Sequence, residues 1–470
     1  MDHVPLSIRF TLLAGATLIF LSGGASAPVL GAERTAPVSG DLPRLGGDFK
    51  GVDWPRFLGP TGDSRSPERG ILTRWGENGP PLVWHREVGT SYGIGSVAAG
   101  RYFQFDRHGN RARLTCLNAR TGELLWKFEY PTDYEDLVGY NNGPRCSPVV
   151  DEGLVYLFGA EGMLHCVRAD DGRLVWKVDT ARQFGVVPNY FGVGSTPVVE
   201  GNLLIVMVGG SPAESQGAGR FDLDRAVGNG TAVVAFDKRT GAVKYAVGDE
   251  LASYAAPQLA TIDGRRWCFV FARGGLLGLD PLSGKIDFHY PWRSRLRDSV
   301  NASTPVVVGN EVFISETYGP GSSLLRVKPG GYEVVWRDPP GRTKAMQTHW
   351  NTPVYHEGYL YGSSGRHFSD AELRCIEWSS GKVIWSQPNL SRASLLYVDG
   401  HFVCLGEDGV LRLVKATPER YVEVAKAVVR ETPEGPRLLK APAWAAPILS
   451  HGLLYVRGDN RVVCLRFIPE

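Results

Sequence analysis

LHCVRADDGRLVW, residues 164–176, decides the fold of this chain because the sequence repeats it. An earlier stretch, LTCLNARTGELLW at residues 114–126, again places a Cys ten residues before a Trp. Looser copies occupy residues 233–245, 276–288 and 373–385. A Cys beside a His can signal redox or metal chemistry, but self-similarity at a period near 50 residues is typical of solenoids and propellers. We therefore interpret the phrase as one structural unit used repeatedly.

A second recurring phrase sets the number of units. It consists of a small residue and Pro, then apolar residues and a turn, as in SPVVDEGLVY from residue 147. Two copies lack the Pro but keep the frame. The equivalent positions are Val97, Pro148, Pro197, Pro257, Pro305, Pro353, Leu395 and Pro447. Eight copies at spacings near the length of one four-stranded blade predict eight blades.

Each unit predicts four antiparallel strands. In the second unit, Pro148 opens a short apolar strand, where its missing N–H does least harm. Alternating residues 154–158 and 164–167 predict the next two strands. Asp171 and Gly172 then form a hairpin turn, and residues 174–178 form the fourth strand.

The ends of the chain predict how the ring closes. The last copy holds only three strands, at residues 446–449, 453–457 and 462–467, while a spare strand, residues 81–88, precedes the first copy. Trp84 in that strand matches the Trp of the fourth strands. We expect it to complete the last blade, because closure removes free sheet edges. The fold class is therefore all-β, an eight-bladed β-propeller; a seven-bladed ring with a degenerate copy at residues 393–429 is the alternative.

The repeated phrase resembles the tryptophan-docking motif of the quinoprotein-like (PQQ-like repeat) β-propellers, Ala-x-Asp-x-x-x-Gly-x-x-x-Trp. The resemblance covers residues 54–467. It implies a propeller like that of the outer-membrane β-barrel assembly machinery or of the dehydrogenases that depend on pyrroloquinoline quinone (PQQ). In such a fold the aromatic residues fill the space between blades. This role is expected for Trp126, Trp176, Trp336 and Trp385, with Cys116, Cys166, Cys375 and Cys464 as small buried residues.

The N-terminus has the pattern of a secretory signal. Arg9 precedes an apolar run at residues 10–21, and Ala25-Ser26-Ala27 fits a cleavage site. The predicted domains are a signal peptide at 1–27, a flexible linker at 28–53 and the propeller at 54–470. No Cys precedes Cys116, so we expect no lipid anchor through an N-terminal Cys. The protein is expected to be exported, periplasmic or extracellular, and monomeric, with no transmembrane segment after cleavage; an uncleaved anchor is the alternative.

Composition and motifs exclude several function classes. The formal net charge is +2 among 470 residues, which gives no electrostatic case for nucleic-acid binding. The sequence has no Gly-x-Ser-x-Gly, P-loop, His-Glu-x-x-His or Cys-x-x-Cys-His motif. His349 and His356 are spaced poorly for a metal pair. No catalytic residue and no metal site is predicted.

Irregular loops point to one face as the site. The loops between the fourth strand of one blade and the first of the next are long and varied, and they share a face with the loops between second and third strands. Arg293, Arg295 and Arg297 alternate there and could bind a carboxylate or phosphate, or else bond neighbouring blades. The candidate residues are Tyr134, Glu135, Asp136, Asn141, Asn142, Arg145, Asn189, Tyr190, Arg293, Arg295, Arg297, Asp298, Asn301, Gln347, His349 and Trp350.

The resemblance implies PQQ with Ca²⁺ as the possible cofactor, for which Glu135, Asp136, Asn141, Asn142, Asp298 and Asn301 offer oxygen ligands. The chain lacks the adjacent Cys pair that many of the dehydrogenases carry. We therefore expect an exported, non-catalytic scaffold of the cell envelope that binds a protein or an envelope ligand, such as a polysaccharide, on its irregular face. A PQQ-dependent alcohol or sugar dehydrogenase is the alternative.

Overall fold

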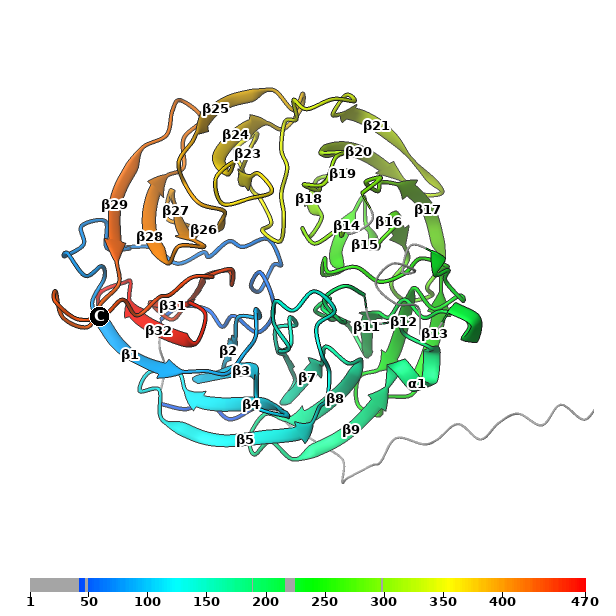
Figure 1. Cartoon of the computed structure of the whole chain (residues 1–470), viewed down its shortest axis with the longest axis horizontal. Helices are drawn as coiled ribbons and strands as arrows, with labels where there is room; N and C mark the ends of the chain where they lie inside the picture. Colours follow the sequence, from blue (N-terminus) through cyan, green and yellow to red (C-terminus); the bar gives the residue numbers. More distant parts are fainter. Residues whose placement is uncertain (1–41, 47–49, 188, 216–224, 297–298) are drawn as a thin grey trace, which may run out of the picture. The chain divides into compact units, whose positions relative to one another are not determined.

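The computed structural model describes residues 42–46, 50–187, 189–215, 225–296 and 299–470. The predicted signal peptide, most of the predicted linker, and Arg297 and Asp298 lie outside the described residues. Within them the chain forms eight four-stranded antiparallel sheets that follow one another in a ring, whose centre we call the channel (Figure 1). The prediction of an eight-bladed propeller is confirmed.

The strands of the first four blades run outward from the channel in chain order. Blade one comprises β2 (Ser96–Ala98), β3 (Arg101–His108), β4 (Arg111–Asn118) and β5 (Leu124–Pro131). Blade two comprises β6 (Val149–Asp151), β7 (Leu154–Phe158), β8 (Met163–Arg168) and β9 (Leu174–Asp179). Blade three comprises β10 (Val198–Glu200), β11 (Leu203–Met207), β12 (Val233–Asp237) and β13 (Val243–Val247). Blade four comprises β14 (Gln258–Ile262), β15 (Arg265–Phe271), β16 (Gly275–Leu279) and β17 (Ile286–Pro291).

The remaining blades follow the same order until the ring closes. Blade five comprises β18 (Val306–Val308), β19 (Glu311–Ser315), β20 (Ser322–Lys328) and β21 (Gly331–Arg337). Blade six comprises β22 (Val354–His356), β23 (Tyr359–Ser364), β24 (Glu372–Glu377) and β25 (Val383–Gln387). Blade seven comprises β26 (Ala393–Val398), β27 (His401–Gly406), β28 (Val410–Lys415) and β29 (Glu423–Val428). Blade eight comprises β30 (Ile448–Ser450), β31 (Leu453–Arg457), β32 (Arg461–Arg466) and, outermost, β1 (Leu82–Glu87).

Strand β1 closes the ring as predicted. It pairs antiparallel with β32, and Trp84 lies opposite Cys464. Blade eight thus takes its outer strand from the N-terminal part of the chain, and the seven-bladed alternative is excluded. The short helices α1 (Thr180–Phe184) and η1 (Ala213–Ser215) lie in connecting loops. Within the described residues we find no helix long and apolar enough to span a membrane.

Docking of an aromatic ring on a glycine joins neighbouring blades. A Cβ atom on Gly172 would lie 2.5 Å from the ring of Trp126 in the preceding blade, so only glycine leaves room for the indole. The same contact recurs between Trp84 and Gly122, Trp176 and Gly241, Tyr245 and Gly284, and Trp336 and Gly381. The indole of Trp176 also donates to the Lys238 carbonyl at 3.0 Å. These aromatic residues are therefore part of the core between the blades.

The cysteines of the repeated phrase are buried and unpaired by disulfides. Cys166 lies opposite Trp176 in the β8–β9 ladder, and burial raises the pKa of its thiol well above the ordinary value. The neighbouring His165 points the other way and packs 4.2 Å from the ring of Tyr130. Cys166 and His165 therefore do not act as a pair, and the thiol behaves as a small apolar group.

The N-terminal segment, residues 50–72, crosses the face of the ring opposite the irregular loops. Trp54 exchanges two backbone hydrogen bonds of 2.8 Å with Val97 of blade one. The Ser64 hydroxyl donates to the Leu395 carbonyl of blade seven at 2.6 Å. Phe57 and Leu58, which lie between these anchors, reach the channel and form the floor of its cavity. A segment that precedes all the strands thus lies against this end of the channel.

Candidate functional site

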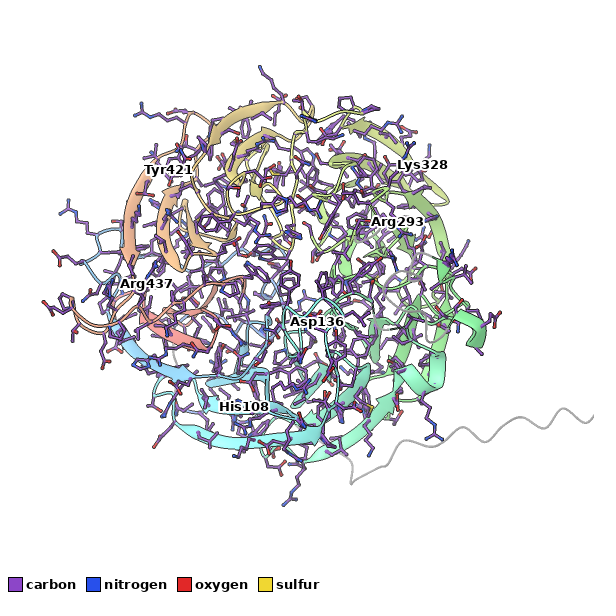
Figure 2. The ribbon with its side chains drawn as sticks, in the orientation of Figure 1. His108, Asp136, Arg293, Lys328, Tyr421 and Arg437 are labelled. Atoms are coloured by element: carbon purple, nitrogen blue, oxygen red, sulfur yellow. The ribbon has the colours of Figure 1, made fainter. Side chains whose placement is uncertain are left out.

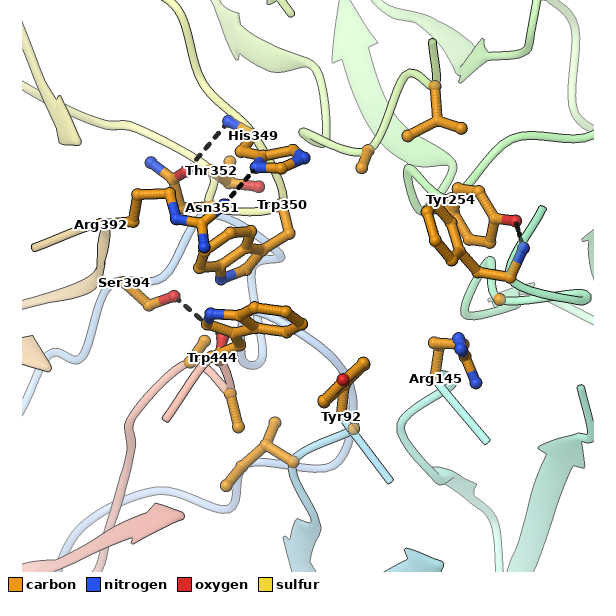
Figure 3. Close-up of a pocket in the computed structure, with 18 of the residues that line it drawn as sticks. Tyr92, Arg145, Tyr254, His349, Trp350, Asn351, Thr352, Arg392, Ser394 and Trp444 are labelled. Atoms are coloured by element: carbon orange, nitrogen blue, oxygen red, sulfur yellow. Dashed lines mark hydrogen bonds between the residues drawn. The ribbon is translucent and has the colours of Figure 1, made fainter. Parts of the chain in front are cut away.

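A cavity of about 400 Å³ opens at the mouth of the channel, on the face of the irregular loops (Figure 3). This volume lies within the usual range for small-molecule sites. All eight blades contribute to its wall, mainly through the loops that lead into their first strands. One residue from each blade, in order, is Ile94, Arg145, Gly194, Tyr254, Ala302, Trp350, Arg392 and Trp444.

These eight wall residues occupy one position of the repeat. Each stands three residues before the position marked by Pro148 in blade two and by its equivalents elsewhere. We call this the mouth position. It holds a large side chain in blades two, four, six, seven and eight, and a small one, Gly194 or Ala302, in blades three and five. The cavity is therefore a regular feature of the repeat. Its shape depends on which blades have a large side chain at the mouth position.

One wall is an arc of aromatic rings, made by Tyr92, Trp444, Trp350, His349 and Tyr318. Successive ring centroids along this aromatic arc are 4.5, 4.7, 5.0 and 5.5 Å apart. Such contacts stabilise tilted aromatic pairs beyond their buried area. The indole Nε1 atoms of Trp350 and Trp444 are buried and have no hydrogen-bond partner among the described residues, which is uncommon for buried donors.

The opposite wall is a second aromatic cluster. Phe191 lies 5.9 Å from Tyr140 and 5.7 Å from Tyr254, measured between ring centroids. The backbone N–H of Phe191 donates to the Tyr254 hydroxyl at 2.8 Å, which fixes the two residues together (Figure 3). The cavity therefore lies between two aromatic surfaces.

Arg392 is held rigidly at the base of the aromatic arc. Its guanidinium forms a bidentate ion pair with Glu407 and lies 4.4 Å from the ring centroid of Trp350. The Nη1 atom also donates to His349 Nδ1 at 3.0 Å and to the Arg366 carbonyl at 2.8 Å. A bidentate pair combined with stacking suits Arg rather than Lys. The charge of Arg392 is compensated by Glu407.

The bond from Arg392 determines how His349 and Tyr318 share protons. Arginine only donates, so Nδ1 of His349 accepts and the proton of the neutral ring sits on Nε2. Nε2 lies 2.9 Å from the Tyr318 hydroxyl and donates to it. Burial, together with the charges of Arg392 and Arg366, lowers the pKa of His349 to about 3. His349 therefore stays neutral near pH 7, and the Tyr318 hydroxyl keeps its own proton to donate elsewhere.

Arg145 and Asp136 form a second ion pair beside the cavity, at 2.6 Å. The Asp136 side chain is fully buried and also accepts from the Val138 N–H at 2.8 Å. The guanidinium of Arg145 lies 5.6 Å from the ring centroid of Tyr92. Asp136 thus positions Arg145 at the cavity wall and does not itself line it.

Three of the predicted site residues line the cavity: Arg145, His349 and Trp350. Others support its loops from below. The Asn301 amide donates to the carbonyls of Ala272, Arg273 and Trp292, and the Asn189 amide donates to Ala252. The buried supporting residues are Tyr134, Asp136, Asn141, Asn189, Tyr190 and Asn301.

The remaining predicted residues lie away from the cavity lining. Gln347 is half-buried and takes part in the hydrogen bonds of its loop. Glu135, Asn142, Arg293 and Arg295 are exposed. Figure 2 shows Asp136 near the centre of the ring and Arg293 farther from it. Arg293 and Arg295 therefore do not line the cavity, and Arg297 lies outside the described residues, so anion binding by these arginines stays a prediction.

Several lining residues were not anticipated from the sequence, notably Tyr92, Tyr254, Tyr318, Arg366 and Arg392. Tyr254 and Arg392 stand at the mouth position, so the repeat register carries the signal that identifies them. Tyr318 and Arg366 come from loops between second and third strands, which follow no common register. These two required the structure.

The comparisons with known proteins agree with this architecture. A family model described as outer membrane protein assembly factor BamB, of the PQQ-like repeat type, matches residues 110–387, more than half of the chain. The chain belongs to this PQQ-like propeller family. A search of curated proteins found no match.

Two solved structures share the fold of this PQQ-like propeller. BamB from Moraxella catarrhalis is 13% identical with a TM-score of 0.53, and the match covers 83% of this chain and 97% of that one. The quinohemoprotein alcohol dehydrogenase from Comamonas testosteroni is 13% identical with a TM-score of 0.60, covering 89% and 82%. At this identity the similarity concerns the fold alone, because one fold hosts many functions.

The residues at the mouth do not fit PQQ held by Ca²⁺. Calcium takes about six to eight oxygen ligands, several of them from carboxylates. Among the described residues no aspartate or glutamate lines the cavity, and no three His, Cys, Asp or Glu side chains gather in a metal-binding group. The nearby acids are engaged elsewhere, Asp136 and Glu407 by Arg145 and Arg392, and Glu316 by the backbone N–H groups of its own loop. We therefore derive no reaction through this cofactor.

Proposed function

We propose that this PQQ-like propeller is a non-catalytic binding scaffold of the cell envelope that holds a partner protein at the mouth of its channel. The main support is the cavity wall, in which aromatic rings and arginines face one space. Of the nearby acids, Asp136 and Glu407 are each paired with an arginine. Aromatic residues and arginine are enriched where proteins bind their partners. The signal-like sequence at residues 1–27 supports a place in the envelope.

Exposed apolar side chains on the loops around the cavity support a protein partner. Tyr140 is 63% exposed and Phe368 is 55% exposed, and both belong to loops that supply the cavity lining. Large exposed apolar residues that gather at one place mark interaction sites. The assembly-factor description of the family model fits the same proposal.

Capture from envelope extracts tests the proposal, because the chain offers a matched control. The double variant Tyr140→Ser/Phe368→Ser removes apolar surface at the mouth. The control is the variant Leu282→Ser/Leu124→Ser. Leu282 is 63% exposed and Leu124 is 55% exposed, which matches the mouth residues, but both lie near the hairpins of the opposite face and the outer strands. The proposal expects a partner that the wild type and the control retain and the mouth variant loses. A partner retained equally by all three proteins would contradict it.

Reconstitution tests the catalytic alternative directly. Purified protein is titrated with PQQ and Ca²⁺, and quinone absorbance and dye reduction by alcohols and sugars are followed. The proposal expects neither Ca²⁺-dependent quinone binding nor turnover. Turnover by the wild type that is lost in Trp350→Ala would show that the protein is an enzyme and would contradict the scaffold proposal.

A further inference from the structure

One end of the cavity carries polar groups that the protein itself leaves available. Arg366 and Tyr318 both line the cavity, and the Arg366 guanidinium lies 4.8 Å from the Tyr318 ring centroid. Both come from loops that join second and third strands, Tyr318 from blade five and Arg366 from blade six. They meet at the end of the aromatic arc.

The Tyr318 hydroxyl is prepared to donate. Since His349 Nε2–H occupies one lone pair of its oxygen, the phenolic proton is directed away from His349. The Tyr318 backbone is fixed as well, because its N–H donates to Glu316 Oε2 at 2.7 Å. Burial raises the pKa of Tyr318 to about 12, so the hydroxyl keeps its proton near pH 7.

Arg366 supplies the uncompensated charge of the cavity. Arg145 and Arg392 each have a carboxylate partner, at Asp136 and Glu407. Among the residues that the structure describes, no carboxylate lies within ion-pair distance of Arg366. A cation beside a donor hydroxyl in a partly desolvated site favours an anionic group.

The rest of the lining favours an apolar, flat body over a sugar. Several of its hydroxyl and amide groups are already used within the protein, and the Ser147 hydroxyl is a lining group without a hydrogen-bond partner among the described residues. Asn351 accepts from the His349 N–H and donates to the Ser363 carbonyl, and the Ser394 hydroxyl donates to the Trp444 carbonyl. Apart from Tyr318 and Arg366, the partners left for a polyhydroxylated ring are chiefly the Ser147 hydroxyl and the two indole N–H groups of Trp350 and Trp444, and unpaired hydroxyls are costly to bury. Aromatic rings on both walls instead offer stacking surfaces.

We infer that Tyr318 and Arg366 form a carboxylate subsite at the end of the mouth cavity, and that the ligand carries its carboxylate on an aromatic body. The inference rests on the proposed binding function and specifies what the mouth recognises. Such a carboxylate can belong to a free aromatic acid or to a chain terminus that ends in an aromatic residue. His349 is a positioning residue, since it acts by orienting the Tyr318 hydroxyl.

Four probes, applied to the full chain, test whether the site requires a carboxylate and whether that carboxylate belongs to a free acid or to a chain terminus. They are 3-phenylpropionate, its neutral amide, the tripeptide Gly-Gly-Phe and the same tripeptide amidated. Tryptophan fluorescence and calorimetry report binding, since Trp350 and Trp444 line the site. We expect an acid to bind with a Kd of about 1 mM or tighter and its amide to bind at least about tenfold more weakly. Tighter binding of the tripeptide acid assigns the source to a chain terminus, and tighter binding of the free acid assigns it to a small molecule.

Substitutions locate the effect. Arg366→Gln is expected to weaken binding of the acid about tenfold or more and to leave the amide unchanged, and Tyr318→Phe to weaken the acid about three- to tenfold. His349→Leu should weaken the acid as well. His349→Gln should restore it, because a Gln amide can accept from Arg392 and donate to Tyr318. Arg295→Gln, an exposed arginine outside the cavity, is the matched control.

Equal binding of acid and amide by the wild type would overturn the subsite, as would saturable binding by none of the four probes. Neither result depends on a variant folding correctly. Partner capture that survives in Arg366→Gln but fails in Tyr140→Ser/Phe368→Ser would show that the partner protein does not use the subsite, and it would leave the scaffold function standing. The two proposals therefore fail separately.

Discussion

A Cβ atom on Gly194 would lie 2.6 Å from Cδ1 of Tyr254. The two residues occupy the mouth positions of neighbouring blades three and four. Because Gly194 has no side chain, the Tyr254 ring can lie beside it. The same Cβ would lie 3.1 Å from Cβ of Arg145 on the other side. The shape of the cavity thus depends on a glycine whose neighbours are both lining residues.

Gly194→Ala should therefore alter binding at the mouth more than stability. The added methyl displaces the Tyr254 ring and weakens capture of the ligand or partner, while overpacking at this site costs about 1–3 kcal/mol. Binding and urea unfolding are measured on the same preparation. Gly331→Ala, where a Cβ meets nothing within 4 Å, is the control. Unchanged binding in Gly194→Ala would show that Tyr254 does not shape the site.

Gly241→Ala should destabilise the contact between blades two and three. The residue has φ of +70°, and its Cβ would lie 2.8 Å from the Trp176 ring, so conformational strain and a clash combine. We expect a loss of about 2–4 kcal/mol in the free energy of unfolding. Gly309→Ala has a similar φ of +59° but open space around its Cβ, so it isolates the strain. Equal losses in the two variants would mean that the indole contact contributes nothing.

Trp84→Ala should weaken closure of the ring. The indole is 7% exposed, packs 5.9 Å from the rings of both Tyr102 and Tyr455, and donates to the Ala119 carbonyl at 2.9 Å. Loss of a buried aromatic ring costs about 3–5 kcal/mol. Urea unfolding measures the change, with Leu124→Ala on the exposed outer strand of blade one as the control. A change no larger than that of the control would indicate that β1 holds the ring without its Trp.

His165 predicts a pH dependence of stability. Burial, with a smaller contribution from the charge of Lys177, lowers the pKa of His165 to about 3 in the folded state, against about 6.5 when unfolded. Between these values the unfolded state binds the extra proton, so the stability present above pH 6.5 is lost as the pH falls, by about 1.4 kcal/mol per pH unit. His349, whose pKa is also lowered to about 3, adds a similar slope, so His165→Leu should reduce the slope in urea unfolding measured from pH 7 to pH 5 without removing it. An unchanged slope would show that His165 does not ionise on unfolding.

Much of the fold could be predicted because the same sequence pattern occurs in each of the blades. The spacing of Pro148 and its equivalents indicated eight blades, and the unmatched strand around Trp84 indicated closure. The segment at residues 50–72 escaped prediction, since it has no repeat, no periodicity and contacts that reach far along the chain. Its anchor between Ser64 and Leu395 joins residues 331 positions apart.

The site was only partly predictable for a related reason. The sequence indicated the correct face and three lining residues, Arg145, His349 and Trp350. The charge of the cavity could not be predicted. Asp136 and Glu407 pair with Arg145 and Arg392, and the positions of these residues in the sequence do not indicate that they meet. The mouth position was already present in the repeat register, three residues before each Pro or its equivalent, Val97 or Leu395. Only the structure showed that this position faces the channel in every blade.

Closure by β1 has a consequence for the order in which the protein forms. Leu82 pairs with Leu465, so a strand made early in synthesis waits for a partner made after seven blades have been synthesised. Val52, whose carbonyl accepts from the Ser450 hydroxyl 398 positions later, waits in the same way. Contacts of such sequence separation form slowly. While the chain is still growing, β1 carries an open edge that can join another sheet. A ribosome-bound chain lacking blade eight should therefore be the form most prone to aggregation and most in need of a chaperone.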